Sequence, residues 1–411
     1  MNIGKNSCMQ RVNKLAKIRF KGYDISLERK TIGEITTSFS GGTPKSSNKS
    51  YYEGDIPFIR SGEVKSKQTE LFISDEALQN SSAKMVSQGD ILYALYGATS
   101  GEVAISQING AINQAILAIK PNSGYSSEFI MNYLKKEKNN ILEKYLQGGQ
   151  GNLSAAIVKG IELNLPSLAE QSSIGSLFRI LDDLLSSYKD NLINYQSFKE
   201  TMLFKMFPQV GQTVPEIRLD RFEDRWEERC IGELADIVRG ASPRPIQNPK
   251  WFDSNSEIGW LRISDVTNQN GRIHSLEQKI SKLGQEKTRV LIEPHLLLSI
   301  AATVGKPVVN YVKTGVHDGF LIFMNPKFDR EFMFQWLEMF REKWNRYGQP
   351  GSQVNLNSDI VKNQKMLIPS MEEQRAIGTY FSNLDNLINS YQEKITQLET
   401  LKKKLLQDMF I

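Results

Sequence analysis

The chain has 411 residues, 40% of them hydrophobic and 24% charged, a composition that excludes intrinsically disordered, collagen-like and disulfide-scaffold proteins. Two cysteines and three histidines are too few for a disulfide framework or a Cys/His metal cluster, so we expect a reducing, cytoplasmic setting and no metal site. The most apolar stretches, 91–98 and 296–304, are too short to cross a bilayer, and the N-terminus lacks the apolar core of a signal peptide.

The net charge of +5 is concentrated near the N-terminus. Residues 1–30 carry eight basic and two acidic side chains, a balance of +6, which leaves the rest of the chain at −1. A basic arm on a near-neutral body permits nucleic-acid binding without requiring it. A solvated N-terminal segment that binds nothing is an equally good interpretation, and both stay open.

The sequence contains one internal repeat with a period of about 200 residues. Four motifs of the first copy return in order: IRF (18–20) as IRL (217–219), IGEI (32–35) as IGEL (231–234), IPFIR (56–60) as IGWLR (258–262), and ATSG (98–101) as ATVG (302–305). From residue 152 onward the copies align at a constant offset of 203 residues (355 − 152). Each copy therefore has a variable first part of about 120 residues and a constant second part of about 60.

The variable parts have the patterns of small mixed α and β domains. In the first copy, short apolar or β-branched runs bounded by Gly, Asn and Pro predict strands at 91–95, 103–105 and 116–119, followed by a helix at 128–146. The second copy predicts the same order: strands at 296–300, 308–311 and 320–324, then a helix at 330–347. We therefore expect an α+β fold class, in which each variable part forms a globule that leads into a long helix.

The constant parts predict two helices of about 40 residues, or about 60 Å each. Each begins with a capping-box pattern, Pro166–Glu170 and Pro369–Glu373, in which the serine accepts from the glutamate amide and the glutamate side chain reaches back to the cap. Apolar residues then alternate steps of four and three, a heptad seam in which Lys199 and Lys402 fill the matching gaps. The seams consist of Ile174, Phe178, Leu181, Leu185, Tyr188, Leu192, Tyr195, Met202 and Met206, and of Ile377, Phe381, Leu384, Ile388, Tyr391, Ile395, Leu398, Leu405 and Met409.

A helix of this length with a narrow apolar stripe must bury that stripe against another helix. The nearest partner is the duplicate, and two like helices related by a perpendicular two-fold axis run antiparallel. We therefore predict an antiparallel coiled coil that separates the two globules. The alternative, in which each seam is ordinary core of its own bundle, stays open.

A search for catalytic motifs finds none. A phosphate-binding loop fails at Gly305-Lys306, because Pro307 occupies the position of the hydroxyl residue. Asn248–Phe252 has only a faint likeness to the Asn-Pro-Pro-aromatic motif of amino-methyltransferases, since Lys250 replaces the second proline. His317-Asp318 lies at a strand edge and is interpreted as a structural pair. These observations predict no catalytic residue and favour a binding or scaffolding protein.

Polar clusters recur at matching positions and are the candidate binding residues. Gly41–Lys45 (GGTPK) corresponds to Gly240–Arg244 (GASPR), a rigid turn that offers a hydroxyl and a cation to phosphates or base edges, with a plain solvated turn as the alternative. Arg60 and Arg262 follow matching strands, where an arginine either reads a guanine edge or makes a buried ion pair. For the glycine loops 148–152 and 351–355 a hinge or close-packing role is favoured.

In this order and duplicated, the motifs resemble the specificity (S) subunits of type I restriction-modification enzymes over residues 18–411. The similarity rests on residues 51–64 (YYEGDIPFIRSGEV), on the Gly-x-Thr/Ser-Pro turns, and on the runs 165–182 and 368–385. There are two departures: Phe58 replaces the commoner tryptophan, and residues 191–198 are poor in charge.

The resemblance implies a non-catalytic subunit that reads a split site in double-stranded DNA. It implies two target-recognition domains (18–146 and 208–347) and two spacer helices (147–207 and 348–411) that dock two methyltransferase (M) subunits. Residues 1–17 have no repeat partner and are interpreted as a basic arm, with a start-site artefact as the alternative. Restriction/motor (R) subunits would join through the complex, and S-adenosylmethionine, ATP and Mg would act in those partners. The candidate DNA-contacting residues are Thr43, Lys45, Arg60, Tyr96, Thr99, Ser242, Arg244, Arg262, Thr303 and Lys306.

A second hypothesis is a coiled-coil adaptor that binds only proteins. The two differ in salt dependence, because DNA affinity falls steeply with salt concentration. They differ also in geometry. If the helices set the distance between two DNA half-sites, one extra heptad in both helices lengthens the spacer by about 10 Å, which is about three base pairs.

Overall fold

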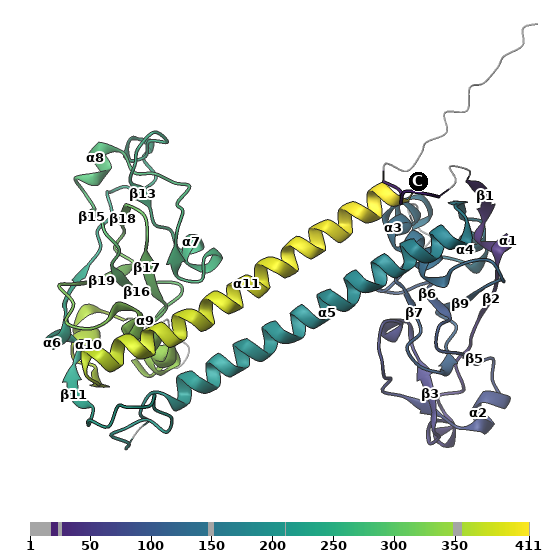
Figure 1. Ribbon diagram of the computed structural model, residues 1–411, viewed down its shortest axis with the longest axis horizontal. Coiled ribbons are helices and arrows are strands. Elements are labelled where there is room, and N and C mark those ends of the chain that lie inside the picture. Colours follow the sequence, from purple (N-terminus) through teal and green to yellow (C-terminus); the bar gives the residue numbers. More distant parts are fainter. Residues whose placement is uncertain (1–17, 24–26, 147–151, 210, 348–355, 411) are drawn as a thin grey trace, which may run out of the picture. The chain divides into compact units, whose positions relative to one another are not determined.

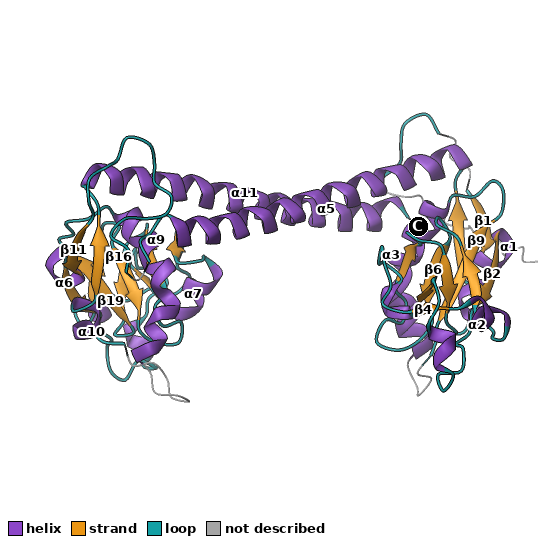
Figure 2. Ribbon diagram, turned by 90° about the horizontal axis from the view of Figure 1, so that it is seen from below, coloured by secondary structure: helices purple, strands orange, loops and turns teal. Residues whose placement is uncertain are grey.

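The computed structural model describes residues 18–23, 27–146, 152–209, 211–347 and 356–410, and the chain divides into two compact units (Figures 1 and 2). Unit 1 is formed by Met1–Lys189 and Glu393–Ile411, and unit 2 by Asp190–Gln392. Each unit contains one variable part of the repeat together with stretches of both long helices. The predicted basic arm 1–17 lies outside the described residues, as do the predicted hinge loops 148–152 and 351–355 except for Asn152.

Unit 1 contains two four-stranded sheets, with strand orders β2-β9-β6-β7 and β4-β3-β8-β5, and a two-stranded ribbon β1-β10. Its strands are β1 (Glu28–Thr31), β2 (Thr36–Ser40), β3 (Ile56–Ile59), β4 (Phe72–Ile73), β5 (Lys84–Val86), β6 (Ile91–Ala94), β7 (Val103–Ile105), β8 (Gly110–Ile112), β9 (Ile116–Pro121) and β10 (Glu162–Leu165). Its helices are α1 (Ile32–Ile35), α2 (Asp75–Gln79), α3 (Ser127–Leu146), α4 (Ala155–Lys159) and the first part of α5 (Leu168–Lys205).

Unit 2 contains a five-stranded sheet, β12-β19-β16-β17-β14, a three-stranded sheet, β13-β18-β15, and the ribbon β11-β20. Its strands are β11 (Glu227–Cys230), β12 (Asp236–Arg239), β13 (Gly259–Trp260), β14 (Arg272–Ile273), β15 (Arg289–Leu291), β16 (Leu296–Ser299), β17 (Pro307–Asn310), β18 (Thr314–Val316), β19 (Phe320–Met324) and β20 (Lys365–Ile368). Its helices are α6 (Ile231–Leu234), α7 (Ile263–Asn268), α8 (Lys282–Gln285), α9 (Arg330–Phe340), α10 (Ser358–Lys362) and the first part of α11 (Met371–Met409).

The predicted strands and helices are confirmed, with ends that differ by one or two residues in several of them and with one larger difference. The helix expected at 330–347 is α-helical only to Phe340, and Arg341–Tyr347 continue as a 3₁₀ helix. The apolar stretches near 91 and 296 form the buried strands β6 and β16. No helix in the described part of the chain is both long and apolar enough to span a membrane.

The cores of the two units are closed by equivalent phenylalanines from the ends of the long helices. In unit 1, Phe410 after α11 lies 5.0 Å (ring centroids) from Phe129 of α3. In unit 2, Phe207 after α5 lies 5.4 Å from Phe332 of α9. The first seam residues of each helix also belong to these cores, namely Ile174, Phe178 and Leu181 in unit 1 and Ile377 and Phe381 in unit 2. Each seam is therefore domain core at its start.

Beyond that point, α5 and α11 contact each other within each unit. In unit 1, Asp182 of α5 binds Lys402 of α11, so an early residue of one helix meets a late residue of the other. In unit 2, Lys199 of α5 lies 2.5 Å from Asp385 of α11. Both contacts have the antiparallel sense, which confirms the predicted pairing. Each of the two seam lysines thus pairs with an aspartate of the other helix.

The predicted capping boxes are only half present. Ser167 and Ser370 accept from the amides of Glu170 and Glu373, both at 3.4 Å, as expected. The carboxylates of these glutamates, which were expected to reach back to the caps, instead bind arginines from the start of each repeat. A guanidinium provides a charged partner for a carboxylate that is 1% exposed, which a single backbone amide does not.

Candidate nucleic-acid interface

A glycine-led turn in each unit packs its backbone directly against a second loop. A side chain at Gly41 would collide with the carbonyl oxygen of Ile112, and one at Gly240 with that of His317. The amide of Gly42 donates to Ile112 at 3.2 Å, and the amide of Ala241 to Val316 at 3.0 Å. The two turns are therefore seated in the same way on the loops that follow β8 and β18.

The hydroxyl of each turn makes an equivalent bond to the second loop. Thr43 donates to the side-chain oxygen of Gln114, and Ser242 donates to Asp318 Oδ1 at 2.8 Å. In unit 2 the exposed guanidinium of Arg244 also binds Asp318, at 2.5 Å. Each predicted turn is therefore fixed in place by a side-chain hydrogen bond to a loop about 70 residues away in the sequence.

The arginines that follow β3 and β13 are held by nearby acids. Arg60 donates to Glu63 through Nε at 3.1 Å and Nη2 at 3.0 Å. Arg262 makes the same two contacts with Asp265, at 3.1 and 2.8 Å. Of the two roles left open by the sequence, the structure shows the ion pair, in a partly exposed form. The carboxylate of Glu63 loses solvation on burial, but its bonds to Arg60 outweigh this and lower its pKa to about 2.

In unit 2 these elements converge on a cleft of about 290 Å³. Three predicted DNA-contacting residues, Ser242, Arg244 and Arg262, line it. Its other lining residues are Ile246, Trp260, Ile263, His317 and Asp318. Trp260 was not among the predicted contact residues, and His317-Asp318 was predicted to be a structural pair only. The pair follows β18 and the turn follows β12, so their contact is made across 76 residues and has no local signal in the sequence.

The His317 ring lines this cleft and is held in one orientation. Its Nδ1 accepts from the amide of Gly319 at 2.9 Å, and the ring packs edge-on against Phe320, with centroids 4.8 Å apart. Burial lowers the pKa of His317, partly opposed by Asp318, so the neutral ring carries its proton on Nε2 at pH 7. Burial would raise the pKa of Asp318, but Ser242 and Arg244 outweigh it and lower that pKa.

The other predicted contact residues lie elsewhere in their units. Thr303 bonds Ser299 at 3.1 Å, and Lys306 is largely buried between Glu338 (2.5 Å) and Asn270 (2.8 Å). In unit 1, Tyr96 forms a β-bridge with Asn152, and burial raises its pKa. Thr99 is part of the turn between Gly97 and Gly101, both of which have positive φ. Among the described contacts, none of these four residues forms a hydrogen bond or ion pair with the glycine-led turns.

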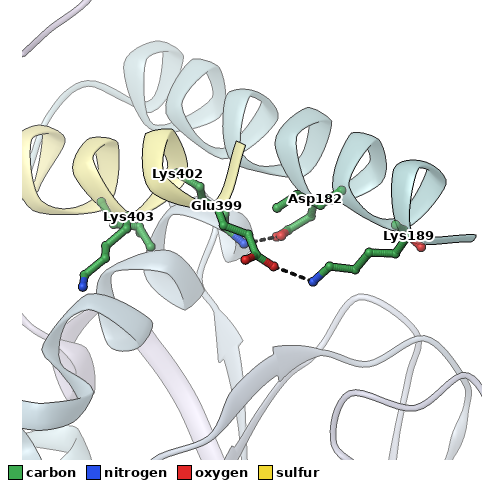
Figure 3. A pocket seen from close by; sticks show the side chains of 8 residues that line it. Asp182, Lys189, Glu399, Lys402 and Lys403 are labelled. Atoms are coloured by element: carbon green, nitrogen blue, oxygen red, sulfur yellow. Dashed lines mark hydrogen bonds and ion pairs between the residues drawn. The ribbon is translucent and has the colours of Figure 1, made fainter. Parts of the chain in front are cut away.

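A second polar surface follows the helix pair in unit 1 (Figure 3). It surrounds a cavity of about 560 Å³, lined by Asp182, Leu185, Ser186, Lys189, Glu399, Lys402, Lys403 and Leu406. Lys402 points toward Asp182 and Lys189 toward Glu399, at 2.6 Å, whereas Lys403 points away (Figure 3). The predicted seam residues from Ile174 to Leu192 and from Ile377 to Ile395 are all buried or half-buried.

Together these features define a class: a duplicated binding protein built from two α+β units and a helix pair, with anchored polar turns in both units. Among the described residues, no group of His, Cys, Asp or Glu could hold a metal ion.

Comparison with known proteins identifies the class further. The profile of the type I restriction modification DNA specificity domain matches residues 25–195 and 223–400, so the chain belongs to this family and contains the domain twice. The MjaVIII specificity subunit of Methanocaldococcus jannaschii is 21% identical over 342 residues, which cover 78% of each chain. The EcoR124I/EcoR124II specificity subunit of Escherichia coli is 25% identical over 175 residues, 40% of this chain and 43% of that one.

Solved structures share the fold. The S subunit of a type I restriction-modification system from M. genitalium has a TM-score of 0.64 at 14% identity, covering 97% of this chain and 99% of that one. A chain from a structural study of complex assembly in the type I R-M system has a TM-score of 0.55 at 16% identity, with 94% and 98% covered. The chain is therefore a specificity subunit of the type I kind, a non-catalytic component with two recognition domains.

Proposed function

We propose that unit 1 and unit 2 each read one half of a split site in double-stranded DNA, through the surfaces formed by the glycine-led turns. The observation that carries this is the duplicated contact of each turn with the loop after β8 or β18. A rigid turn that holds a cation and a hydroxyl at the surface is suited to phosphates and base edges. Arg239 and Arg289, both exposed, add positive charge beside the Asp318 loop.

We further propose that the helix pair docks two methyltransferase subunits, through which the restriction/motor subunits join. S-adenosylmethionine, ATP and Mg would serve those partners in the cytoplasm. Support comes from one face of α5, where the apolar side chains of Ile180 and Leu184, four residues apart, are exposed. Exposed apolar residues grouped on a helix are typical of protein contacts.

The first experiment measures DNA binding of the chain assembled with its methyltransferase subunits, at two salt concentrations. The proposal expects the logarithm of affinity to fall with log salt, with a slope of about −0.9 per phosphate contacted. A protein-binding adaptor would show no such dependence. Methylation sequencing of host DNA, with and without the gene, then identifies the site: one split motif should disappear on deletion. An unchanged methylome in a strain that expresses the methyltransferase subunits contradicts the proposal.

The spacer role of the helices has its own test. Adding one heptad to both α5 and α11 adds about 10 Å of helix, or about three base pairs of spacer. The methylated motif should then keep both half-sites and gain about three base pairs between them. A motif with an unchanged spacer would show that the helices do not set the distance. Adding a heptad to α5 alone is the matched control, since it breaks the pairing and should abolish methylation.

A further inference from the structure

The internal duplication separates a constant frame from side chains that differ between the two units. The frame comprises the turn glycine and proline, the turn hydroxyl, and the arginine held by an acid three residues later. On this frame three equivalent positions carry different residues. They are Lys45, Asn113 and Gln114 in unit 1, and Arg244, His317 and Asp318 in unit 2.

The two loop residues that differ most are anchored by the same bond. Asn113 Oδ1 accepts from the amide of Ala115 at 3.1 Å, and His317 Nδ1 accepts from the amide of Gly319 at 2.9 Å. In both cases a side-chain acceptor binds the backbone two residues on. The remaining polar atom is a donor in each, the amide nitrogen of Asn113 and the Nε2–H of neutral His317. Donors held in a fixed orientation can pair with the acceptor atoms on base edges.

The next loop position is anchored in the same way by the turn hydroxyl. The hydroxyl of Thr43 donates to the side-chain oxygen of Gln114, so the amide nitrogen of Gln114 remains as a hydrogen-bond donor. Ser242 occupies Asp318 Oδ1, while Asp318 Oδ2 holds Arg244 at 2.5 Å. A guanidinium held by a carboxylate loses less conformational freedom on binding than a free one, and it keeps further N–H donors for a ligand.

We propose that Lys45, Asn113 and Gln114 read base edges in one half-site, that Arg244, His317 and Asp318 do so in the other, and that the shared frame only positions them. This inference rests on the proposed function and deepens it. Arg244 is the guanine reader of unit 2, because arginine pairs with guanine O6 and N7 in the major groove. The half-sites differ because unit 1 offers amide and ammonium donors where unit 2 offers a guanidinium, an imidazole and a carboxylate.

The test uses the full chain assembled with its methyltransferase subunits and a library of duplexes that carry every single-base change of the methylated motif. Arg244→Gln should lower discrimination for one guanine of one half-site about 10- to 100-fold and leave the other half-site unchanged. Arg244→Lys, which keeps the charge but loses the two-pronged geometry, should weaken the same preference and no other. Lys45→Arg should alter preference only in the other half-site.

The matched control is Lys313→Gln, which removes an exposed lysine of unit 2 that pairs with Glu257 at 2.7 Å and does not line the cleft. It should change no base preference. A uniform loss of affinity for all duplexes in Arg244→Lys would make Arg244 a phosphate contact and overturn the inference. So would unchanged preferences in Arg244→Lys, Lys45→Arg and Asp318→Asn together. If instead the unmodified complex shows no sequence-specific binding, the proposed function itself fails.

Discussion

The seam lysines of the helix pair are equivalent in sequence but not in environment, so we expect their removal to have unequal costs. Lys199 and Asp385 have exposed side-chain fractions of 16% and 14%, and they lie 2.5 Å apart. Lys402 has a similar exposed fraction of 17%, but its partner Asp182 is 40% exposed. Replacing each lysine by methionine keeps the apolar stem and removes only the ammonium group.

The magnitude follows from what remains around each aspartate. After Lys199→Met, the carboxylate of Asp385 keeps Gln335 at 2.9 Å and Arg272 at 3.3 Å, so the loss is one charged hydrogen bond. This costs about 1.5–3 kcal/mol of unfolding free energy, less than the roughly 3–5 kcal/mol of a buried charge left alone. After Lys402→Met, water solvates Asp182, and the cost is about 0–1 kcal/mol.

Tryptophan fluorescence distinguishes the two substitutions, because all five tryptophans of the chain lie in unit 2. In denaturant titrations, Lys199→Met should lower the midpoint of the fluorescence transition, whereas Lys402→Met should leave it unchanged and move only the circular dichroism signal slightly. Lys189→Met is the control, since Lys189 and Glu399 are 51% and 52% exposed. If Lys402→Met destabilises the protein as much as Lys199→Met, exposure of the partner does not govern the cost.

Three further predictions concern the buried partner of Arg218, the acid that holds Arg60, and the turn glycine Gly41. Arg218→Gln leaves a glutamate carboxylate that is 1% exposed without its guanidinium, so it should lower the unfolding free energy by about 3 kcal/mol, measured by tryptophan fluorescence; a change below about 1 kcal/mol would contradict this. The pKa of Glu63 is lowered to about 2, so its contribution to stability is present above pH 4.5 and lost as the pH falls from 4.5 to 2; circular dichroism melts should show a smaller acid loss in Arg60→Gln. Gly41→Ala should destabilise unit 1 by about 1–3 kcal/mol, because the added carbon meets a carbonyl oxygen, whereas Gly62→Ala has open space and should be neutral within about 0.5 kcal/mol.

Most of the fold could be predicted from local periodicity in the sequence. The heptad steps predicted α5 and α11 and their pairing, because a narrow apolar stripe on a long helix has few ways to be buried. The repeat predicted that every element would occur twice. The sequence marked Lys199 only as a gap in the seam, since its partner Asp385 is 186 residues away. Long-range ion pairs leave no local pattern.

The candidate site was predictable only in part, for the same reason. The glycine-led turns, with Thr43 and Ser242, were visible as motifs. The residues that complete them, Gln114 and Asp318, lie 71 and 76 residues further along and carry no motif of their own. Lys306, a predicted DNA-contacting residue, likewise has a partner that no motif marked, since Glu338 on α9 binds its ammonium at 2.5 Å. A motif that occurs in both halves of the chain therefore indicates a backbone structure common to both units. The role of each side chain depends on the residues that it contacts in the fold.

The seam lysines also explain how one helix register is selected. A leucine at Lys199 would pack as well after a shift of one heptad, whereas an ammonium with a buried aspartate partner is satisfied in only one register. Asp385 at the same time accepts from Arg272 of β14 and Gln335 of α9. The same carboxylate therefore ties α5 to α11 and α11 to the sheet and helix of unit 2. A slip of α5 along α11 would break the Lys199–Asp385 pair, whereas Arg272 and Gln335 would still hold the carboxylate in place, so unit 2 offers Lys199 a fixed partner in one register of the seam only.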